Sequence, residues 1–333
     1  MTDTAPVSDL AGEARALAGA RDWSGLVSYL DAVPEERLYA EPEAAFLLAD
    51  ALWRLAEPAR AAEVASRVLA LAGQRGDQRL VLRALNVLGI SFFNRGAMAE
   101  AEEHFAALLD GAANHGDEVF VARAANNLGM IANIRGERDQ ALPYYVRAMA
   151  GYRREGNERG LAQTHHNLGI TYRDLGFDSD ADTHFRRAIE LAASTNTEEV
   201  VAMAETERAL MRVRSGDAKL GGEMARRALE RCRRIGDPLG EGHAARVIAA
   251  ACRAEQRPDE ALERLGEALE IARVHSDALL HAEVQRDRGE ILRERGEVEA
   301  AREAFADAAA HFEALGAAAE AQALRAILAS LEA

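Results

Sequence analysis

The sequence of 333 residues has few of the residues that form disulfide frameworks or interrupt helices. Its two cysteines, Cys232 and Cys252, are too few for a disulfide framework and fit a reduced cytoplasmic setting. Only seven residues are proline and only 5% are aromatic, whereas 49% are hydrophobic, mostly alanine and leucine. This composition favours helices over strands and is apolar enough to form a sizeable core.

Long apolar runs and a basic charge balance are also missing. The longest stretch without Asp, Glu, Lys or Arg is thirteen residues, 160–172, and a membrane-spanning helix needs roughly 18 or more. The first ten residues, MTDTAPVSDL, are acidic and polar, unlike a secretory signal. The net charge is −15, and Lys219 is the only lysine, so the bulk charge argues against nucleic-acid binding. We therefore expect a cytoplasmic protein with no membrane segment.

What the sequence does contain is a repeat with a period of 40 residues. Residues 84–109, 124–149 and 163–189 share a Leu-Gly pair, a glycine seven residues later, then an alanine and an aromatic residue. Weaker copies on both sides bring the number of units to about seven. The shared positions are Gly89, Gly129 and Gly169; Gly96, Gly136 and Gly176; Ala101, Ala141 and Ala181; and Phe105, Tyr145 and Phe185.

Each unit is predicted to be a pair of antiparallel helices. Apolar residues recur at helical spacing on both sides of a central turn such as Arg95-Gly96. Units are joined at pairs such as Gly76-Asp77 and Gly156-Asn157, in which glycine ends one helix and the next residue caps the following helix. A single pair cannot cover its own apolar face, so the units must stack.

This pattern resembles the tetratricopeptide repeat (TPR), from about residue 43 to 311. The period of 40 rather than the usual ~34 residues is similar to that of the subclass with longer helices: kinesin light chains, Rap-type peptide-sensing regulators and maltose-activator-type arrays. The resemblance implies an all-α protein, an α-solenoid that forms a right-handed superhelix of about seven helix pairs. We expect degenerate capping helices at 8–42, the TPR array at 43–316 and a C-terminal capping helix at 317–333, in one continuous solenoid.

No motif predicts catalysis or a cofactor. P-loop, GxSxG and HExxH sequences are absent. His165 and His166, with His184 in the paired helix, could suggest a metal, but His165 occupies a core-facing repeat position, and we interpret the three as hydrogen-bonded or groove histidines. We therefore expect no enzyme, no metal site and no cofactor.

The resemblance also implies that the first helix of each pair lines a concave groove. Eight of the 28 implied groove positions are arginine and two are acidic, a count of +6. Guanidinium groups suit carboxylates, and asparagine amides can clamp a peptide backbone. The predicted peptide-binding residues are Arg83, Asn86, Arg123, Asn126, Asn133, His166, Arg173, Arg246, Arg253, Arg286 and Arg293. Two other interpretations stay open: the arginines pair with carboxylates of neighbouring units, or they bind phosphate or nucleic acid.

The function predicted first is a non-catalytic interaction module, an adaptor or scaffold, whose groove binds an acidic or extended peptide or a partner protein. One alternative is a sensor-regulator of the Rap-like kind, in which a peptide or small signal closes the superhelix and changes the affinity for a second protein. Another is a structural subunit that forms homo-oligomers through the alanine-rich segments 308–310 and 317–319.

Overall fold

The structure, a computed structural model, describes residues 9–331, which form eighteen helices and no strand. The predicted all-α fold is therefore confirmed. Residue 8, at the start of the predicted N-terminal capping helices, and residues 332–333, at the predicted end of the last helix, lie outside the described residues. Within 9–331, none of the helices combines the length and the apolar character needed to cross a membrane. The chain divides into two compact units, of which the first ends at Phe120 and the second begins at Val121.

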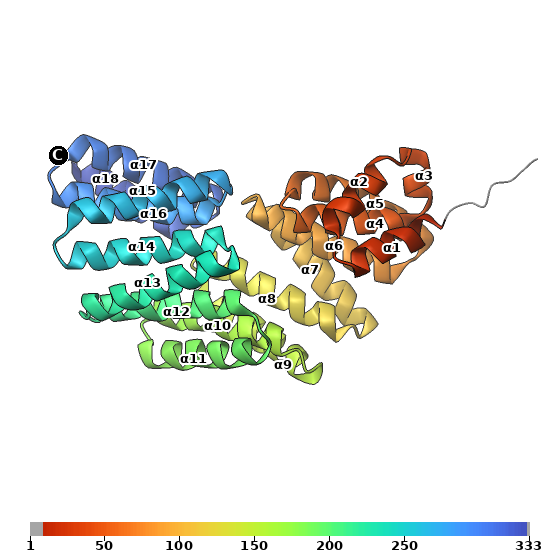
Figure 1. Ribbon diagram of the computed structural model, residues 1–333, viewed down its shortest axis with the longest axis horizontal. Coiled ribbons are helices and arrows are strands. Elements are labelled where there is room, and N and C mark those ends of the chain that lie inside the picture. Colours follow the sequence, from red (N-terminus) through yellow and green to blue (C-terminus); the bar gives the residue numbers. More distant parts are fainter. Residues whose placement is uncertain (1–8, 332–333) are drawn as a thin grey trace, which may run out of the picture. The chain divides into compact units, whose positions relative to one another are not determined.

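The first unit contains three short helices and two helix pairs (Figure 1). The short helices all pack against the first helix of the first pair, and the first helices of the two pairs also contact each other. The sequence did not predict the third short helix. The elements are α1 (Leu10–Gly19), α2 (Trp23–Asp31), α3 (Glu35–Ala40), α4 (Pro42–Arg54), α5 (Pro58–Arg75), α6 (Gln78–Asn94) and α7 (Met98–His115).

The second unit contains five helix pairs and a final helix, and the first turn of its first helix precedes Val121. Figure 1 shows these helices in chain order, with α12 packed on α10, α14 on α12, and α16 on α14. This is the packing of an α-solenoid. The elements are α8 (Glu118–Ile134), α9 (Arg138–Arg154), α10 (Glu158–Asp174), α11 (Asp178–Ser194), α12 (Glu198–Arg214), α13 (Ala218–Ile235), α14 (Pro238–Ala254), α15 (Pro258–Val274), α16 (Ala278–Glu294), α17 (Val298–Ala314) and α18 (Ala318–Leu331).

A residue with left-handed backbone follows each helix from α4 to α17, and these residues recur every 20 positions from Ala56 to Gly316. Ten of them are glycine, which adopts this conformation without steric cost. The other four are Ala56, Asn196, Gln256 and Ser276. The helix ends predicted from the glycines are therefore present even where glycine is replaced.

Close contact between a glycine of the first helix and an aromatic ring of the second holds four of the pairs together. A Cβ atom added to any of these glycines would lie 2.5–2.7 Å from a ring carbon. The four rings are at most 1% exposed, so each belongs to the buried core of its helix pair. The contacts are Gly89 with Phe105, Gly129 with Tyr145, Gly169 with Phe185, and Gly289 with Phe305.

Candidate functional site

Five of the six predicted groove arginines of the second unit lie on α10, α14 and α16, and these five form ion pairs with carboxylates. Arg173 on α10 forms ion pairs with Asp174 of its own helix and with Glu207 on α12. Its side chain is only 10% exposed. The contact with Glu207 links one helix pair to the next. This is the pairing between neighbouring repeats that the sequence analysis left open.

Arg246 on α14 is held more completely. Its Nη1 lies 2.7 Å from Oε2 of Glu283, and its Nε lies 2.7 Å from Oδ2 of Asp287. Both carboxylates belong to α16, and the arginine side chain is 11% exposed. Burial raises the pKa of Asp287, but the charges and hydrogen bonds of Arg246 and Arg286 outweigh it, so the pKa of Asp287 falls below its ordinary value.

The remaining predicted arginines near the end of the array are also paired, but they are more exposed. Arg253 contacts Glu294 at 2.5 Å, Arg286 contacts Asp287 at 3.3 Å, and Arg293 contacts Glu290 at 2.6 Å. The exposed fractions of their side chains are 34%, 26% and 41%. The pair of Arg293 with Glu290, whose arginine is the most exposed of the three, contributes little to stability.

In the first unit, Arg83 on α6 donates two hydrogen bonds of 2.8 Å to the Glu43 carboxylate, and its guanidinium lies 3.9 Å above the Phe46 ring. Asn86 is half-buried, and its Oδ1 atom has no hydrogen-bond partner. Arg123, at the start of α8 in the second unit, is exposed.

The other predicted polar groove residues of the second unit are largely buried. Asn126 is 4% exposed, and its Oδ1 accepts hydrogen bonds from Thr164 and Asn167 on α10. Asn133 accepts a hydrogen bond of 3.0 Å from Thr171. His166 is 3% exposed, and its burial lowers its pKa to about 4. Asn126 and Asn133 therefore link α8 to α10, whereas the buried Nδ1 atom of His166 has no hydrogen-bond partner within the described residues. The peptide-binding role of all three stays a prediction.

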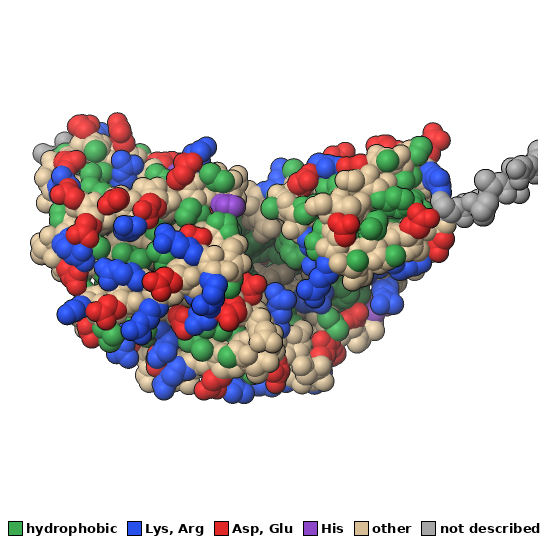
Figure 2. All heavy atoms as spheres, viewed as in Figure 1, with side chains coloured by type: hydrophobic (Ala, Val, Ile, Leu, Met, Phe, Trp, Pro, Cys, Tyr) green, Lys and Arg blue, Asp and Glu red, His purple; other side chains and the backbone are tan. Residues whose placement is uncertain are grey.

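Sequence reasoning missed four carboxylates of this face, although it counted Glu283 and Glu290 among the groove positions. Asp174, Glu207, Asp287 and Glu294 each follow a predicted groove position by one residue, so the face of each first helix is wider than the four positions counted. A count that included the next residue on each helix would have found them. Arginine and acidic side chains accordingly alternate over the second unit in Figure 2 rather than forming one positive patch.

A pocket of about 570 Å³ opens among α12, α14 and α16 of the second unit. Leu210, Ala250 and Ile291 form part of its apolar lining. Its charged lining is Arg214, Arg246, Arg253, Arg286, Asp287 and Glu294.

Arg214, at the C-terminal end of α12, is exposed and has no ion-pair partner within residues 9–331. Partial burial lowers the pKa of Arg214, and so do the positive charges of Arg173 and Arg246, while Asp174 and Glu207 act in the opposite direction. The site therefore combines an apolar surface with a guanidinium that forms no ion pair within residues 9–331, in a lining of four arginines and two carboxylates.

Comparison with known families gives one match. The family model described as tetratricopeptide repeat matches residues 120–194, 200–273 and 244–314, which together are more than half of the chain. No curated protein matched the sequence.

Several solved structures share the fold at low sequence identity. A Rap protein in complex with competence and sporulation factor is 14% identical, with a TM-score of 0.64, over 97% of this chain and 96% of that one. The apo quorum sensor NprR from B. thuringiensis is 13% identical, with a TM-score of 0.57, over 98% and 99%. The Rap conjugation gene regulator of plasmid pLS20, in complex with the Phr* peptide, is 15% identical, with a TM-score of 0.64, over 82% and 74%.

Proposed function

Because the chain belongs to the tetratricopeptide repeat family, we propose that it is a non-catalytic interaction module that binds an extended segment of a partner protein on the first helices of its pairs. Stacked helix pairs present long binding surfaces of this kind. We further propose that the partner segment is acidic and is anchored in the pocket among α12, α14 and α16.

The observation that carries this proposal is the guanidinium of Arg214. Arg214 was not among the groove residues predicted from the sequence. The predicted arginines of the second unit on α10, α14 and α16 already contact carboxylates of this chain, so a ligand must displace an internal partner to reach them. Arg214 needs no such exchange. A carboxylate of the partner can form a bidentate contact there, while an aliphatic neighbour packs on Leu210 and Ile291.

A sensor-regulator role is the second candidate, and the solved structures favour it. Two of the similar structures are described in complex with a peptide or factor, and a third is described as a quorum sensor. On this alternative, the bound segment is a signal peptide whose binding alters the affinity for another protein.

The two free, buried cysteines, Cys232 and Cys252, support the proposed cytoplasmic setting.

Fluorescence anisotropy with two labelled decapeptides tests the proposal. One peptide alternates Glu with Leu, and its counterpart carries Lys in place of Glu. We expect the acidic peptide to bind, the basic peptide not to bind, and the affinity to fall as salt is added. Equal binding of the two peptides would contradict the proposed acidic partner.

The matched variants are Arg214→Glu and Arg212→Glu, because both residues are exposed and lie on α12. Arg214→Glu should weaken binding of the acidic peptide at least tenfold, because it places a like charge at the anchor. Arg212 lies outside the pocket lining, so Arg212→Glu should change the affinity for the acidic peptide by no more than about twofold. If both reversals have the same effect, the pocket is not the binding site. Light scattering over a range of protein concentrations separately tests self-association.

A further inference from the structure

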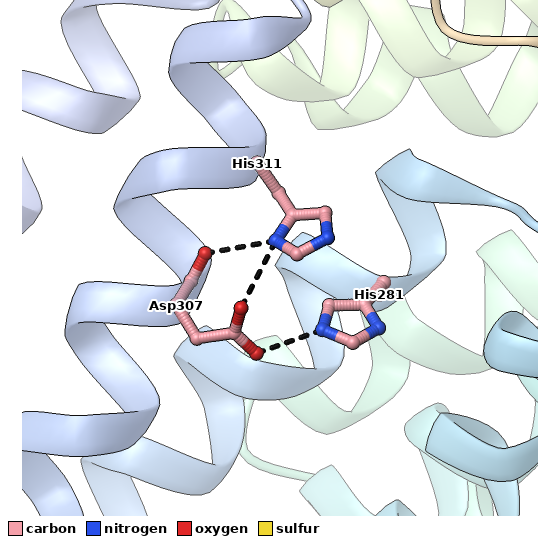
Figure 3. A group of neighbouring side chains, drawn as sticks. All are labelled: His281, Asp307 and His311. Atoms are coloured by element: carbon pink, nitrogen blue, oxygen red, sulfur yellow. Dashed lines mark hydrogen bonds and ion pairs between the residues drawn. The ribbon is translucent and has the colours of Figure 1, made fainter.

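Two histidines and one aspartate meet between α16 and α17 of the second unit, away from the pocket lining (Figure 3). His281 comes from α16, and Asp307 and His311 come from α17, where a separation of four residues places both side chains on one face of the helix. Figure 3 shows nitrogen atoms of the two imidazole rings directed toward the carboxylate that lies beside both rings.

The distances among the three side chains are short. His281 Nε2 lies 2.8 Å from Asp307 Oδ2, and His311 Nδ1 lies 3.2 Å from Asp307 Oδ1. His311 Nδ1 also lies 2.9 Å from the Asp307 backbone oxygen. The imidazole rings are stacked, with centroids 4.1 Å apart. All three ligand atoms lie within 4.8 Å of one another, and two ligands of one tetrahedral zinc ion lie ~3.4 Å apart. Modest side-chain rotations are therefore enough to close the site around an ion.

A fourth residue orients the carboxylate. Gln285, one turn after His281 on α16, donates a hydrogen bond of 2.6 Å from Nε2 to Asp307 Oδ2. Gln285 is 9% exposed, and its Oε1 atom is buried without a hydrogen-bond partner. Outer groups that hold a ligand carboxylate in this way are typical of metal sites.

The cluster is also accessible to an ion. The side chains of His281, Asp307 and His311 are 20%, 36% and 35% exposed. Asp307 contacts imidazole and amide groups, unlike Asp287, whose carboxylate is occupied by two arginines. An incoming cation therefore meets a carboxylate that pairs with no guanidinium in the described part of the chain.

We propose that His281, Asp307 and His311 form a zinc-binding site. Two imidazoles and one carboxylate are ligands that Zn²⁺ prefers, whereas Mg²⁺ and Ca²⁺ prefer sets made of oxygen atoms. The three protein ligands leave the fourth position of a tetrahedral ion for water. Zinc bound here joins α16 to α17 within one helix pair.

Isothermal titration of the full chain with ZnCl₂, after removal of metals with EDTA, tests this site. We expect one zinc ion per chain and no displacement by excess MgCl₂. Asp307→Asn and His281→Gln each remove a ligand and should weaken zinc binding at least tenfold. Gln285→Leu removes only the orienting hydrogen bond and should weaken zinc binding about tenfold. Circular dichroism of each variant checks that the helices are retained.

The matched control is His184→Gln. His184 and His165 form another pair of half-buried histidines, with their Nδ1 atoms 2.9 Å apart, on α11 and α10. This control should bind zinc like the unaltered chain. Cobalt(II) gives an independent measurement, because its visible absorption intensifies in a tetrahedral site, and this signal should be lost in Asp307→Asn. Absence of zinc binding, unchanged affinity in folded Asp307→Asn, or loss of binding only in His184→Gln would each overturn the assignment.

Discussion

Gly129 of α8 lies directly against the ring of Tyr145 of α9. A Cβ atom at Gly129 would be 2.7 Å from Cε1 of that ring. At the equivalent positions of α14 and α15, the residues are Ala249 and Leu265, both buried, so a larger residue on the first helix accompanies a smaller one on the second. The sizes of the two residues are therefore matched across a helix pair.

This matching predicts how the two positions respond to substitution. Gly129→Ala should destabilise the protein by about 1–3 kcal/mol, because the ring and the backbone must move apart. Tyr145→Ala should cost about 3–5 kcal/mol through the cavity that it leaves. In urea unfolding, the double variant Gly129→Ala with Tyr145→Leu should lose less free energy of unfolding than the summed losses of the single variants Gly129→Ala and Tyr145→Leu. Strict additivity would show that the two side chains do not share one space.

Gln256 occupies one of the left-handed positions that glycine fills elsewhere, with φ of 60°. For a non-glycine residue this conformation costs about 1–2 kcal/mol. Glycine avoids that cost, but its greater loss of conformational entropy on folding cancels part of the gain. Gln256→Gly should therefore stabilise the protein by up to about 1 kcal/mol and raise Tm. Gln256→Ala keeps the Cβ atom and should give no such gain, so equal Tm values for the two variants would exclude backbone strain as the cause.

Removal of the buried ion pairs of Arg246 should destabilise the protein more than removal of an exposed ion pair. Arg246→Met leaves Glu283 and Asp287 without their main counterion in a largely buried place, and we expect a loss of about 3 kcal/mol in urea unfolding. The control is Arg273→Met, which removes a pair with Glu270 whose side chains are 68% and 60% exposed. That loss should be much smaller, because solvent screens an exposed ion pair. Similar losses at the two sites would mean that burial does not set the strength of these pairs.

His166 predicts a pH dependence of stability. Burial first, and then the positive charges of Arg173 and His243, lower its pKa to about 4, although Glu207 acts in the opposite direction. In the unfolded chain the pKa is about 6.5, so between pH 6.5 and 4 the unfolded state binds a proton that the folded state does not. Stability should fall as pH falls through this window, by roughly 3 kcal/mol in total from this group.

The measurement is urea unfolding of the unaltered chain and His166→Gln at several pH values from 7 to 4. His165, whose pKa is also lowered to about 4 by burial first and by the charge of His184, titrates in both proteins and cancels in the comparison. The variant should lose less stability on acidification. Parallel curves for the two proteins would mean that His166 is protonated to the same extent folded and unfolded.

The sequence alone determined the repeat, the helix ends and the residues that pack within a pair. These features are local, because a glycine with φ near 75° at Gly96 or a cap at Asp77 acts on the helix beside it. The helical spacing of apolar residues likewise follows from geometry that every helix shares. The short helix α3 was missed because its six residues contain little periodic signal.

Only the tertiary structure decided what the arginines contact. Arg173 pairs with Glu207, 34 residues away, and Arg246 with Asp287, 41 residues away, because stacked first helices bring their faces together. The same stacking leaves Arg214 without an ion-pair partner within residues 9–331. His281 meets Asp307 because paired helices run antiparallel, and a separation of 26 residues along the chain gives no local sign of that contact. Such contacts depend on the rotation of each helix about its axis, and that rotation is set by packing between helices rather than by the residues of one helix.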